Sequence, residues 1–205
     1  MIIDFFLPSP CLICSKIGKP ICENCLRDLN LAGFEVQLAE LSGFSFSEYS
    51  DKASLVVNSI KEKGITAVID DLAKLMVQTW PHRLASANLV PIPSSPENLK
   101  KRGFSHTLLW AKALSRHSNG LVISPVLVSA RSRKDQAQLS PEERQNNMAE
   151  AFSVKGILPT GPMVLIDDVL TTGATIRAAV SAFEDKGLKP VSFCVFTRVR
   201  PRYSP

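Results

Sequence analysis

Residues Met163 to Ile176 read Met-Val-Leu-Ile-Asp-Asp-Val-Leu-Thr-Thr-Gly-Ala-Thr-Ile. The apolar run that opens this segment lies between Gly161-Pro162 and two acids, which is typical of a short buried strand. Apolar residues then recur at helical spacing over residues 174–186, so a helix is predicted to begin directly after the Thr/Gly loop. A strand, a polar loop and a helix in this order place Asp167 and Asp168 at the carboxyl edge of a sheet.

The loop after the two acids has the groups that a phosphate site needs. Gly173 lets the backbone approach a bound oxyanion, and threonine hydroxyls with the free N–H groups of the helix start can bind it. The threonines are Thr171, Thr172 and Thr175. Carboxylates that touched the phosphate would repel it, so Asp167 and Asp168 are better suited to sugar hydroxyls or to a bridging Mg²⁺. The alternative is a surface turn rich in Asp and Thr.

Short apolar runs alternate with helical stretches from residue 87 onward. Strands are predicted at residues 89–93, within 121–128 where Pro125 interrupts or edges the run, at 163–166 and at 191–197, with helices at 107–115 and 174–186. Before this region, residues 26–49 predict a connector, followed by one helix that ends at Gly64 and another that Pro81 ends. The alternation is typical of an α/β fold with a mostly parallel sheet.

Four of the five cysteines form two Cys-x₂-Cys pairs near the start of the chain: Cys11, Cys14, Cys22 and Cys25. Four thiolates at this spacing can surround a zinc ion as a tetrahedron and leave no open position, which predicts a structural Zn²⁺ site in a zinc ribbon. Two disulfides are the alternative. Asp4 and the nearby prolines argue against an export signal, so we expect a reducing, cytoplasmic location, which favours zinc. Cys194, in an apolar run, is predicted to be a buried strand residue.

Positive charge is concentrated in the C-terminal part of the chain. Up to Val90 there are 8 basic and 10 acidic residues, net −2, and from Pro91 onward there are 16 basic and 9 acidic residues, net +7. The excess predicts an anionic partner, either a polynucleotide or a pyrophosphate, unless it is only a solvated basic surface. No segment approaches the roughly 18 apolar residues of a membrane helix, so no membrane insertion is expected.

Further segments extend the pattern over nearly the whole chain. They are Val90-Pro-Ile-Pro-Ser-Ser95, Lys100-Lys-Arg-Gly-Phe104, Gln136, Leu139, Arg144, Asn147 and Ala151-Phe152. The acid and loop segment resembles the phosphoribosyl pyrophosphate signature of type I phosphoribosyltransferases, and the whole set with the cysteine pairs is similar to the ComF/GntX-like family. The resemblance implies a type I phosphoribosyltransferase-like fold preceded by a zinc ribbon. It also implies a bacterial, cytoplasmic protein that binds phosphoribosyl pyrophosphate with Mg²⁺, in a family linked to natural transformation and DNA uptake.

The resemblance implies roles for individual residues. Asp167 and Asp168, as the catalytic pair, would hold the ribose 2′- and 3′-hydroxyls, and residues 171–175 would cradle the 5′-phosphate. The residues implied to bind the substrate are Asp167, Asp168, Val169, Leu170, Thr171, Thr172, Gly173, Ala174 and Thr175. The pyrophosphate loop and a mobile flap are implied to contain Pro93, Ser94, Ser95, Arg102, Arg131, Arg133 and Arg144.

The flap would span residues 131–147, a strongly polar segment with several basic side chains. A cationic flap could neutralise the charge on departing pyrophosphate and exclude water. A solvated loop with basic residues is the alternative.

The chain departs from the family where Arg102-Gly-Phe-Ser-His106 replaces the usual Arg-Gly-Phe-Asn-Gln. Arg133 also stands where the family favours Thr. His106 could contact substrate or act as a base, but a lone histidine that opens a helix is more often a surface residue, and this is the prediction here.

The expected organisation is a zinc ribbon over residues 1–30 and a phosphoribosyltransferase-like domain over residues 31–205. Within the latter, residues 31–85 are expected to form a helical connector or hood and residues 86–205 the core. Two functions follow. The first is transfer of phosphoribose to an unidentified acceptor. The second is a non-catalytic module for DNA uptake that binds single-stranded DNA or a helicase partner and keeps a regulatory or vestigial sugar site, although no run of aromatic residues among Lys and Arg supports stacking on bases.

Overall fold

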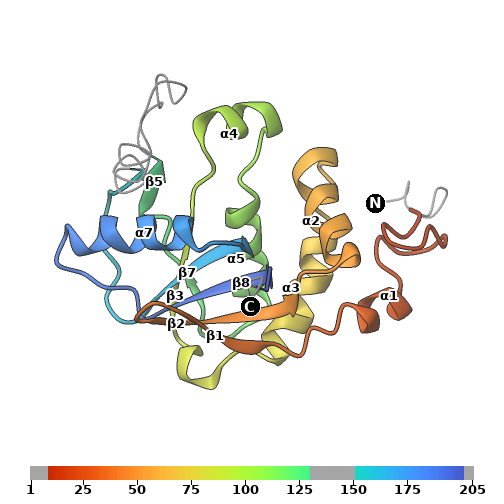
Figure 1. The fold of residues 1–205 in the computed structure, drawn as a ribbon, viewed down its shortest axis with the longest axis horizontal. Coiled ribbons are helices and arrows are strands. Elements are labelled where there is room, and N and C mark those ends of the chain that lie inside the picture. Colours follow the sequence, from red (N-terminus) through yellow and green to blue (C-terminus); the bar gives the residue numbers. More distant parts are fainter. Residues whose placement is uncertain (1–8, 130–150, 201–205) are drawn as a thin grey trace, which may run out of the picture.

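A six-stranded sheet forms the centre of the molecule in the computed structural model, which describes residues 9–129 and 151–200 (Figure 1). Its strands, in spatial order, are β1 (Phe34–Leu38), β2 (Leu41–Glu48), β8 (Ser192–Arg198), β7 (Met163–Leu170), β3 (Asn88–Pro91) and β4 (Val122–Ile123). Only β1 and β2 pair antiparallel within this sheet; its other pairings are parallel. A separate antiparallel pair joins β5 (Leu127–Ser129) to β6 (Phe152–Val154). The predicted α/β fold with a mostly parallel sheet is confirmed.

Helices cover both faces of the sheet. Side chains alternate along a strand, so β7 contributes to two hydrophobic clusters. Val164 and Ile166 belong to the cluster with Trp110 of α5 (His106–Arg116), while Leu165 belongs to the cluster with Phe183 of α7 (Ala174–Glu184). The helices α2 (Asp51–Lys63) and α3 (Val68–Gln78) supply buried residues to the first cluster. The short helix α4 (Pro96–Arg102) has no buried residue and projects away from the sheet (Figure 1).

Local sequence signals account for the helix limits. The Ser50 hydroxyl accepts a hydrogen bond from the Ala53 N–H at 3.2 Å, which caps the start of α2. The helix ends at Gly64, whose φ of +67° is a left-handed conformation that glycine adopts without strain. The helices predicted before Gly64 and before Pro81 are therefore confirmed as α2 and α3.

The predicted connector over residues 26–49 is wrong for its second half, because β1 and β2 occupy it and β2 pairs with β8. Serines obscured the pattern, since Ser45 and Ser47 are fully buried but hydrogen-bonded. Their hydroxyls donate to the carbonyls of Ser47 at 2.8 Å and Phe196 at 2.9 Å. A buried strand normally shows an apolar run, and satisfied polar residues remove that signal.

Two further differences affect the candidate site. The strand β7 continues to Leu170, so Asp167 and Asp168 lie within it rather than after it. The apolar run at residues 121–128 divides at Pro125 into β4 and β5, which belong to different sheets. The predicted flap at residues 131–147, with Arg131, Arg133 and Arg144, lies outside the described residues.

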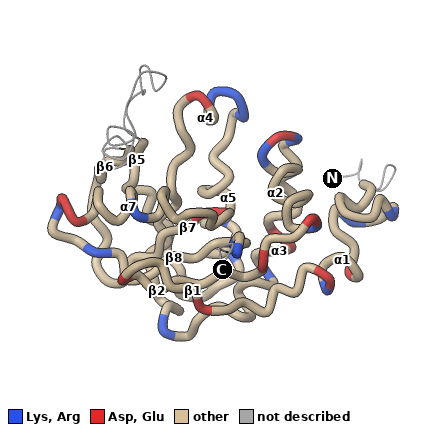
Figure 2. Tube along the Cα trace, in the orientation of Figure 1, with Lys and Arg blue, Asp and Glu red and all other residues tan. Residues whose placement is uncertain are grey.

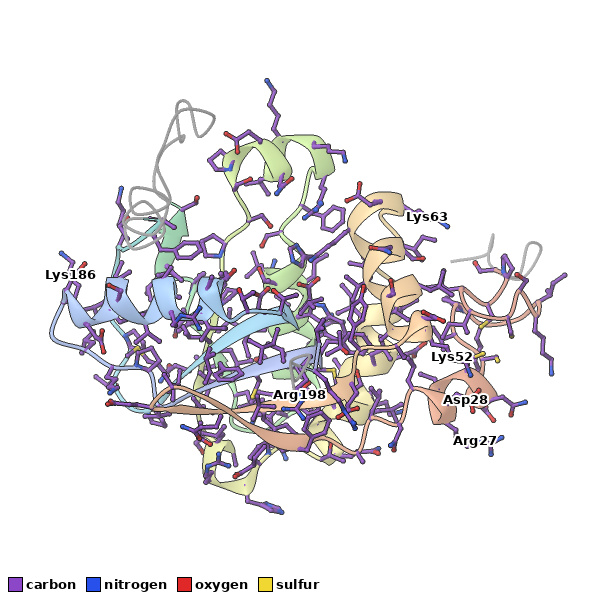
Figure 3. All side chains as sticks on the ribbon, in the orientation of Figure 1. Arg27, Asp28, Lys52, Lys63, Lys186 and Arg198 are labelled. Atoms are coloured by element: carbon purple, nitrogen blue, oxygen red, sulfur yellow. The ribbon has the colours of Figure 1, made fainter. Side chains whose placement is uncertain are left out.

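The N-terminal segment forms a small unit beside the sheet. A turn at Cys11–Cys14 precedes the short helix α1 (Glu23–Asp28), and Cys11, Ile21 and Cys25 are buried in the same cluster as α2 and α3. Lys52 of α2 points toward Asp28 of α1 (Figure 3), with 2.6 Å between Nζ and Oδ2. Within the described ranges, every helix is too short or too polar to cross a membrane.

Candidate functional site

The topology creates a candidate ligand-binding position between β3 and β7, which are neighbours in the sheet. From β3 the chain passes through α4 and α5 to β4, toward one edge of the sheet. From β7 it passes through α7 to β8, in the opposite direction. A parallel sheet opens a crevice outside the carboxyl ends of two strands whose connections diverge in this way. Residues 92–95 and residues 171–173 follow these two strand ends.

The loop after β7 has a conformation that depends on Gly173. Its φ is +76°, and a Cβ atom there would lie 2.4 Å from Cδ1 of Leu38 in β1. Arg177 donates through Nη1 to the carbonyl of Thr172 at 3.0 Å, and the Ala174 N–H donates to the Thr172 hydroxyl at 3.4 Å. The loop therefore folds around the start of α7, where the helix dipole favours negative charge.

The two acids leave β7 on opposite sides, because consecutive side chains of a strand alternate. Asp168 is buried on the side of α2 and α5, and Asp167 is half-buried. The Asp168 N–H donates to Oδ1 of Asp167 at 2.9 Å. One carboxylate oxygen of each acid and a ring nitrogen of His106 all lie within 4.8 Å of one another.

Asp168 has a charged partner that the sequence did not indicate. The Nζ atom of Lys61, in the last turn of α2, lies 2.8 Å from Oδ2 of Asp168. These residues are far apart in the chain and belong to different predicted segments. No local motif predicts such a pair.

His106 is buried, so the prediction that it is a surface residue is wrong. It opens α5 after Ser105, whose hydroxyl caps the helix by accepting the Leu108 N–H at 3.3 Å. Its Nε2 lies 3.6 Å from Oδ1 of Asp168, and its Nδ1 lies 3.3 Å from the hydroxyl of Ser94. The ring thus connects the segment after β3 with the acid in β7.

Burial and neighbouring charges shift the pKa values of the two acids in opposite directions. Burial raises the pKa of Asp167 to about 8, and the negative charge of Asp168 acts in the same direction. Burial also tends to raise the pKa of Asp168, but the neighbouring His106 ring and the Lys61 ammonium outweigh it and hold the pKa below its ordinary value. At neutral pH the pair therefore carries roughly one negative charge, opposite the Lys61 ammonium.

The remaining predicted residues after β3 have identified partners. The Ser95 hydroxyl caps α4 by accepting the Asn98 N–H at 3.3 Å. Glu62 of α2 binds two cations of α4, Lys101 Nζ at 2.8 Å and Arg102 Nη2 at 3.4 Å. Figure 2 shows this concentration of charge at the ends of α2 and α4. Arg102 therefore joins two helices, and Pro93 and Ser94 lie between β3 and α4.

The four N-terminal cysteines form a second cluster whose geometry suits zinc. Their Sγ atoms all lie within 4.8 Å of one another, and those of Cys14 and Cys22 are 3.6 Å apart. A tetrahedron with Zn–S distances of about 2.3 Å has edges of about 3.8 Å. All four are free thiols, and the Cys22 N–H donates to Sγ of Cys11 at 3.4 Å. The arrangement is compatible with the predicted zinc ribbon. The fifth cysteine, Cys194, is buried in β8 as predicted.

Comparison with known proteins agrees with this architecture. A family model for the phosphoribosyl transferase domain matches residues 106–205. Competence protein ComFC of Bacillus subtilis (strain 168) is 28% identical over 200 residues, which cover 92% of this chain and 78% of that protein. DNA utilization protein YhgH of Salmonella typhi is 28% identical over 138 residues, or 64% of this chain and 61% of that protein. Competence protein F of Haemophilus influenzae is 26% identical over 106 residues, or 50% of this chain and 46% of that protein. The matches to these last two relatives span less than two thirds of their lengths.

The fold and the matched domain define an α/β protein with a phosphoribosyltransferase domain. The relatives named for competence and DNA utilization, together with this domain, support a ComF-like family for the chain. The family resemblance found in the sequence is thereby confirmed.

We expect the chain, purified without chelators, to contain about one zinc ion, because four thiolates complete its coordination. Cys14→Ser removes one ligand at an exposed position and should abolish the stoichiometric zinc, whereas Cys194→Ala should retain it. Elemental analysis of the purified variants measures this directly. A wild-type chain without metal, or with the four cysteines in disulfides, would contradict the assignment.

Asp167→Asn should change stability in a pH-dependent way. The pKa of Asp167 is raised from 3.8 to about 8 on folding, so unfolding releases its proton between these values and the wild type loses stability as pH rises through this window. Asn does not titrate and can still accept the Asp168 N–H. The variant should gain at least about 1 kcal/mol relative to wild type between pH 5 and pH 8 in urea unfolding. Asp185→Asn, at an exposed position after α7, is the control. If the stability difference between Asp167→Asn and wild type were the same at pH 5 and at pH 8, Asp167 would be ionised in the folded chain.

Proposed function

We propose that this chain binds phosphoribosyl pyrophosphate with Mg²⁺ and transfers the phosphoribosyl group to an acceptor. One observation carries the proposal. The Thr/Gly loop after β7 and the Pro/Ser segment after β3 meet at one edge of the sheet, in a chain whose C-terminal half matches the phosphoribosyl transferase domain.

The sugar phosphate would lie across the end of β7. Asp167 and Asp168 would accept hydrogen bonds from the ribose hydroxyls. Residues 171–175 would bind the 5′-phosphate through hydroxyls and N–H groups at the start of α7, with the Arg177 guanidinium nearby. The backbone of Val169 and Leu170 would line the site at this end of the strand. In this arrangement the carboxylates contact the ribose hydroxyls, and the loop contacts the 5′-phosphate.

The pyrophosphate would lie toward the segment after β3. Ser94 faces this side and contacts His106, which also approaches Asp168. Pro93 and Ser95 would shape the backbone that approaches the phosphates. The predicted flap, with Arg131, Arg133 and Arg144, would add positive charge as the leaving group departs.

In the reaction, the bond from ribose C1 to the pyrophosphate oxygen breaks and pyrophosphate leaves with the electron pair. A lone pair of the acceptor forms the new bond to C1, and the acceptor loses a proton. Mg²⁺ would enter with the substrate and offset the pyrophosphate charge. Direct binding of Mg²⁺ by Asp168 fits less well, because the Lys61 ammonium already lies 2.8 Å from its Oδ2 and would repel a cation. The protein therefore acts mainly by positioning and by charge stabilisation.

The cysteine cluster and the proposed reaction suit the same compartment. Zinc binding by the four clustered cysteines would need reduced thiols, so we propose a cytoplasmic location. The relatives' names add a biological context, and we propose that the reaction serves DNA uptake or utilization.

The double variant Asp167→Asn/Asp168→Asn should lose affinity for phosphoribosyl pyrophosphate by about a hundredfold or more, because two acceptors of the ribose hydroxyls are weakened. Isothermal calorimetry with Mg²⁺ present measures the change. Glu184→Gln/Asp185→Asn likewise replaces two acids by amides, at exposed positions at the opposite end of α7, and should bind normally. Unchanged affinity in the first variant, with native circular dichroism, would contradict the site.

A second candidate function is binding of single-stranded DNA by the N-terminal unit. Competence and DNA utilization are in the names of the relatives, and Ile17 is 70% exposed between Lys16 and Lys19 beside the cysteine cluster. Lysines would contact phosphates, and an exposed apolar side chain can lie against a base.

Lys16→Ala/Lys19→Ala tests this candidate by electrophoretic shift. Binding through phosphates should weaken steeply between 50 and 200 mM salt, by roughly tenfold for two contacts, and the variant should have a smaller salt dependence. Lys186→Ala/Lys189→Ala, two lysines at the far end of α7, is the control. If wild type causes no shift at low salt, the DNA function is excluded and the phosphoribosyl function is unaffected.

A further inference from the structure

The proposed substrate creates an electrostatic problem at the end of β7. Phosphoribosyl pyrophosphate carries phosphates at both ends of its ribose, while Asp167 and Asp168 lie where that ribose would bind. Like charges a few ångströms apart in a partly buried site repel strongly. A site that accepts this ligand therefore needs a local positive charge for its own acids.

Lys61 meets this need from outside the matched domain. Its Nζ lies 2.8 Å from Oδ2 of Asp168, and the side chains of Lys61 and Asp168 are 24% and 5% exposed. Charge-assisted contacts at this distance are strong when solvent is largely excluded. Lys61 precedes the acid and loop segment by about a hundred residues and lies before residues 106–205, which the domain model matches.

Neighbouring contacts hold Lys61 in place. Gly64 terminates α2 in a left-handed conformation directly after this turn. The adjacent Glu62 binds Lys101 and Arg102 of α4, which follows the segment after β3. The last turn of α2 therefore contacts both the acid in β7 and the helix beyond the proposed pyrophosphate segment.

Other charged groups around Asp168 do not replace Lys61. His106 lies at Oδ1, on the other oxygen, at 3.6 Å, and is held between Asp168 and Ser94. Arg102 is directed to Glu62. In the described part of the chain, Lys61 is the aliphatic ammonium paired with Asp168.

We propose that Lys61 is a positioning residue for a polyanionic sugar phosphate: it neutralises Asp168, so that the acid can accept ribose hydroxyls while phosphates bind on either side. The inference rests on the proposed function and extends the binding site to a helix outside the recognised motif. It predicts that the contribution of Lys61 to affinity increases with the negative charge of the ligand. Lys61 should matter more for phosphoribosyl pyrophosphate than for ribose 5-phosphate, which lacks the pyrophosphate.

Calorimetry on the full chain with Mg²⁺ tests this with Lys61→Met, Lys61→Arg and Lys63→Met. Lys63 lies in the same turn of α2 and is exposed at the outer end of the helix (Figure 3). Lys61→Met should weaken phosphoribosyl pyrophosphate binding by about tenfold and ribose 5-phosphate binding by about threefold or less. Lys61→Arg should recover most of the loss, and Lys63→Met should stay within about twofold of wild type.

A double-mutant cycle with Asp168→Asn shows whether Lys61 acts through Asp168. In that background Lys61→Met should cause little further loss, because no negative charge remains to be neutralised. Thermal unfolding of each variant shows that it is folded at the assay temperature. If Lys61→Met fails to fold, Lys61→Gln removes the charge with a polar side chain, and its ratio of the two ligand affinities decides the question.

The outcomes are distinguishable. A wild type that binds phosphoribosyl pyrophosphate with the same affinity as folded Lys61→Met overturns the role of Lys61 and leaves the proposed function standing. Equal losses for both ligands indicate a structural role and also overturn it. A wild type that does not bind phosphoribosyl pyrophosphate overturns the proposed function and this inference together.

Discussion

A buried carboxylate at the end of β7 is the constraint on which the site's arrangement depends. Asp168 is 4% exposed, and burying a lone charge is costly unless partners compensate it. Its partners come from two different helices, Lys61 from α2 and His106 from α5. The same acid therefore links β7 to helices that precede it in the chain, and each helix must be correctly packed for the charge to be compensated.

This arrangement also explains how two acids and the proposed phosphate-binding loop can be neighbours. Burial and the neighbouring Asp168 raise the pKa of Asp167 and favour its neutral form, and Lys61 opposes the charge on Asp168. The acid pair with Lys61 is then close to neutral, while the loop at Gly173 and the start of α7 would provide the anion-binding groups of the proposed site. Neutral hydroxyl acceptors beside a positive loop suit a ligand that has hydroxyls between phosphates.

Sequence patterns predicted the elements whose signals are local. The helices α2, α3, α5 and α7 follow from apolar spacing and caps, and the cysteine cluster follows from its Cys-x₂-Cys spacing. The strand β2 was missed because buried serines interrupt the apolar run that marks a covered strand. The strand β1 has no serine, and its alternating Phe34-Glu-Val-Gln-Leu38 pattern was overlooked in predicting a connector. His106 was misjudged because its burial comes from packing of α5 against β7, which helix position alone does not reveal.

The acids, the Thr/Gly loop and the following helix are consecutive in the chain, so their relative placement follows from local sequence and strand geometry. The partners of those acids do not. Lys61 and His106 reach Asp168 only because the sheet order sets β7 beside β3 and packs α2 and α5 on the same face. Which charges are compensated, and which acid retains a proton, depends on distances between segments that no sequence spacing encodes, since electrostatic energy in a buried site varies with separation and exclusion of water.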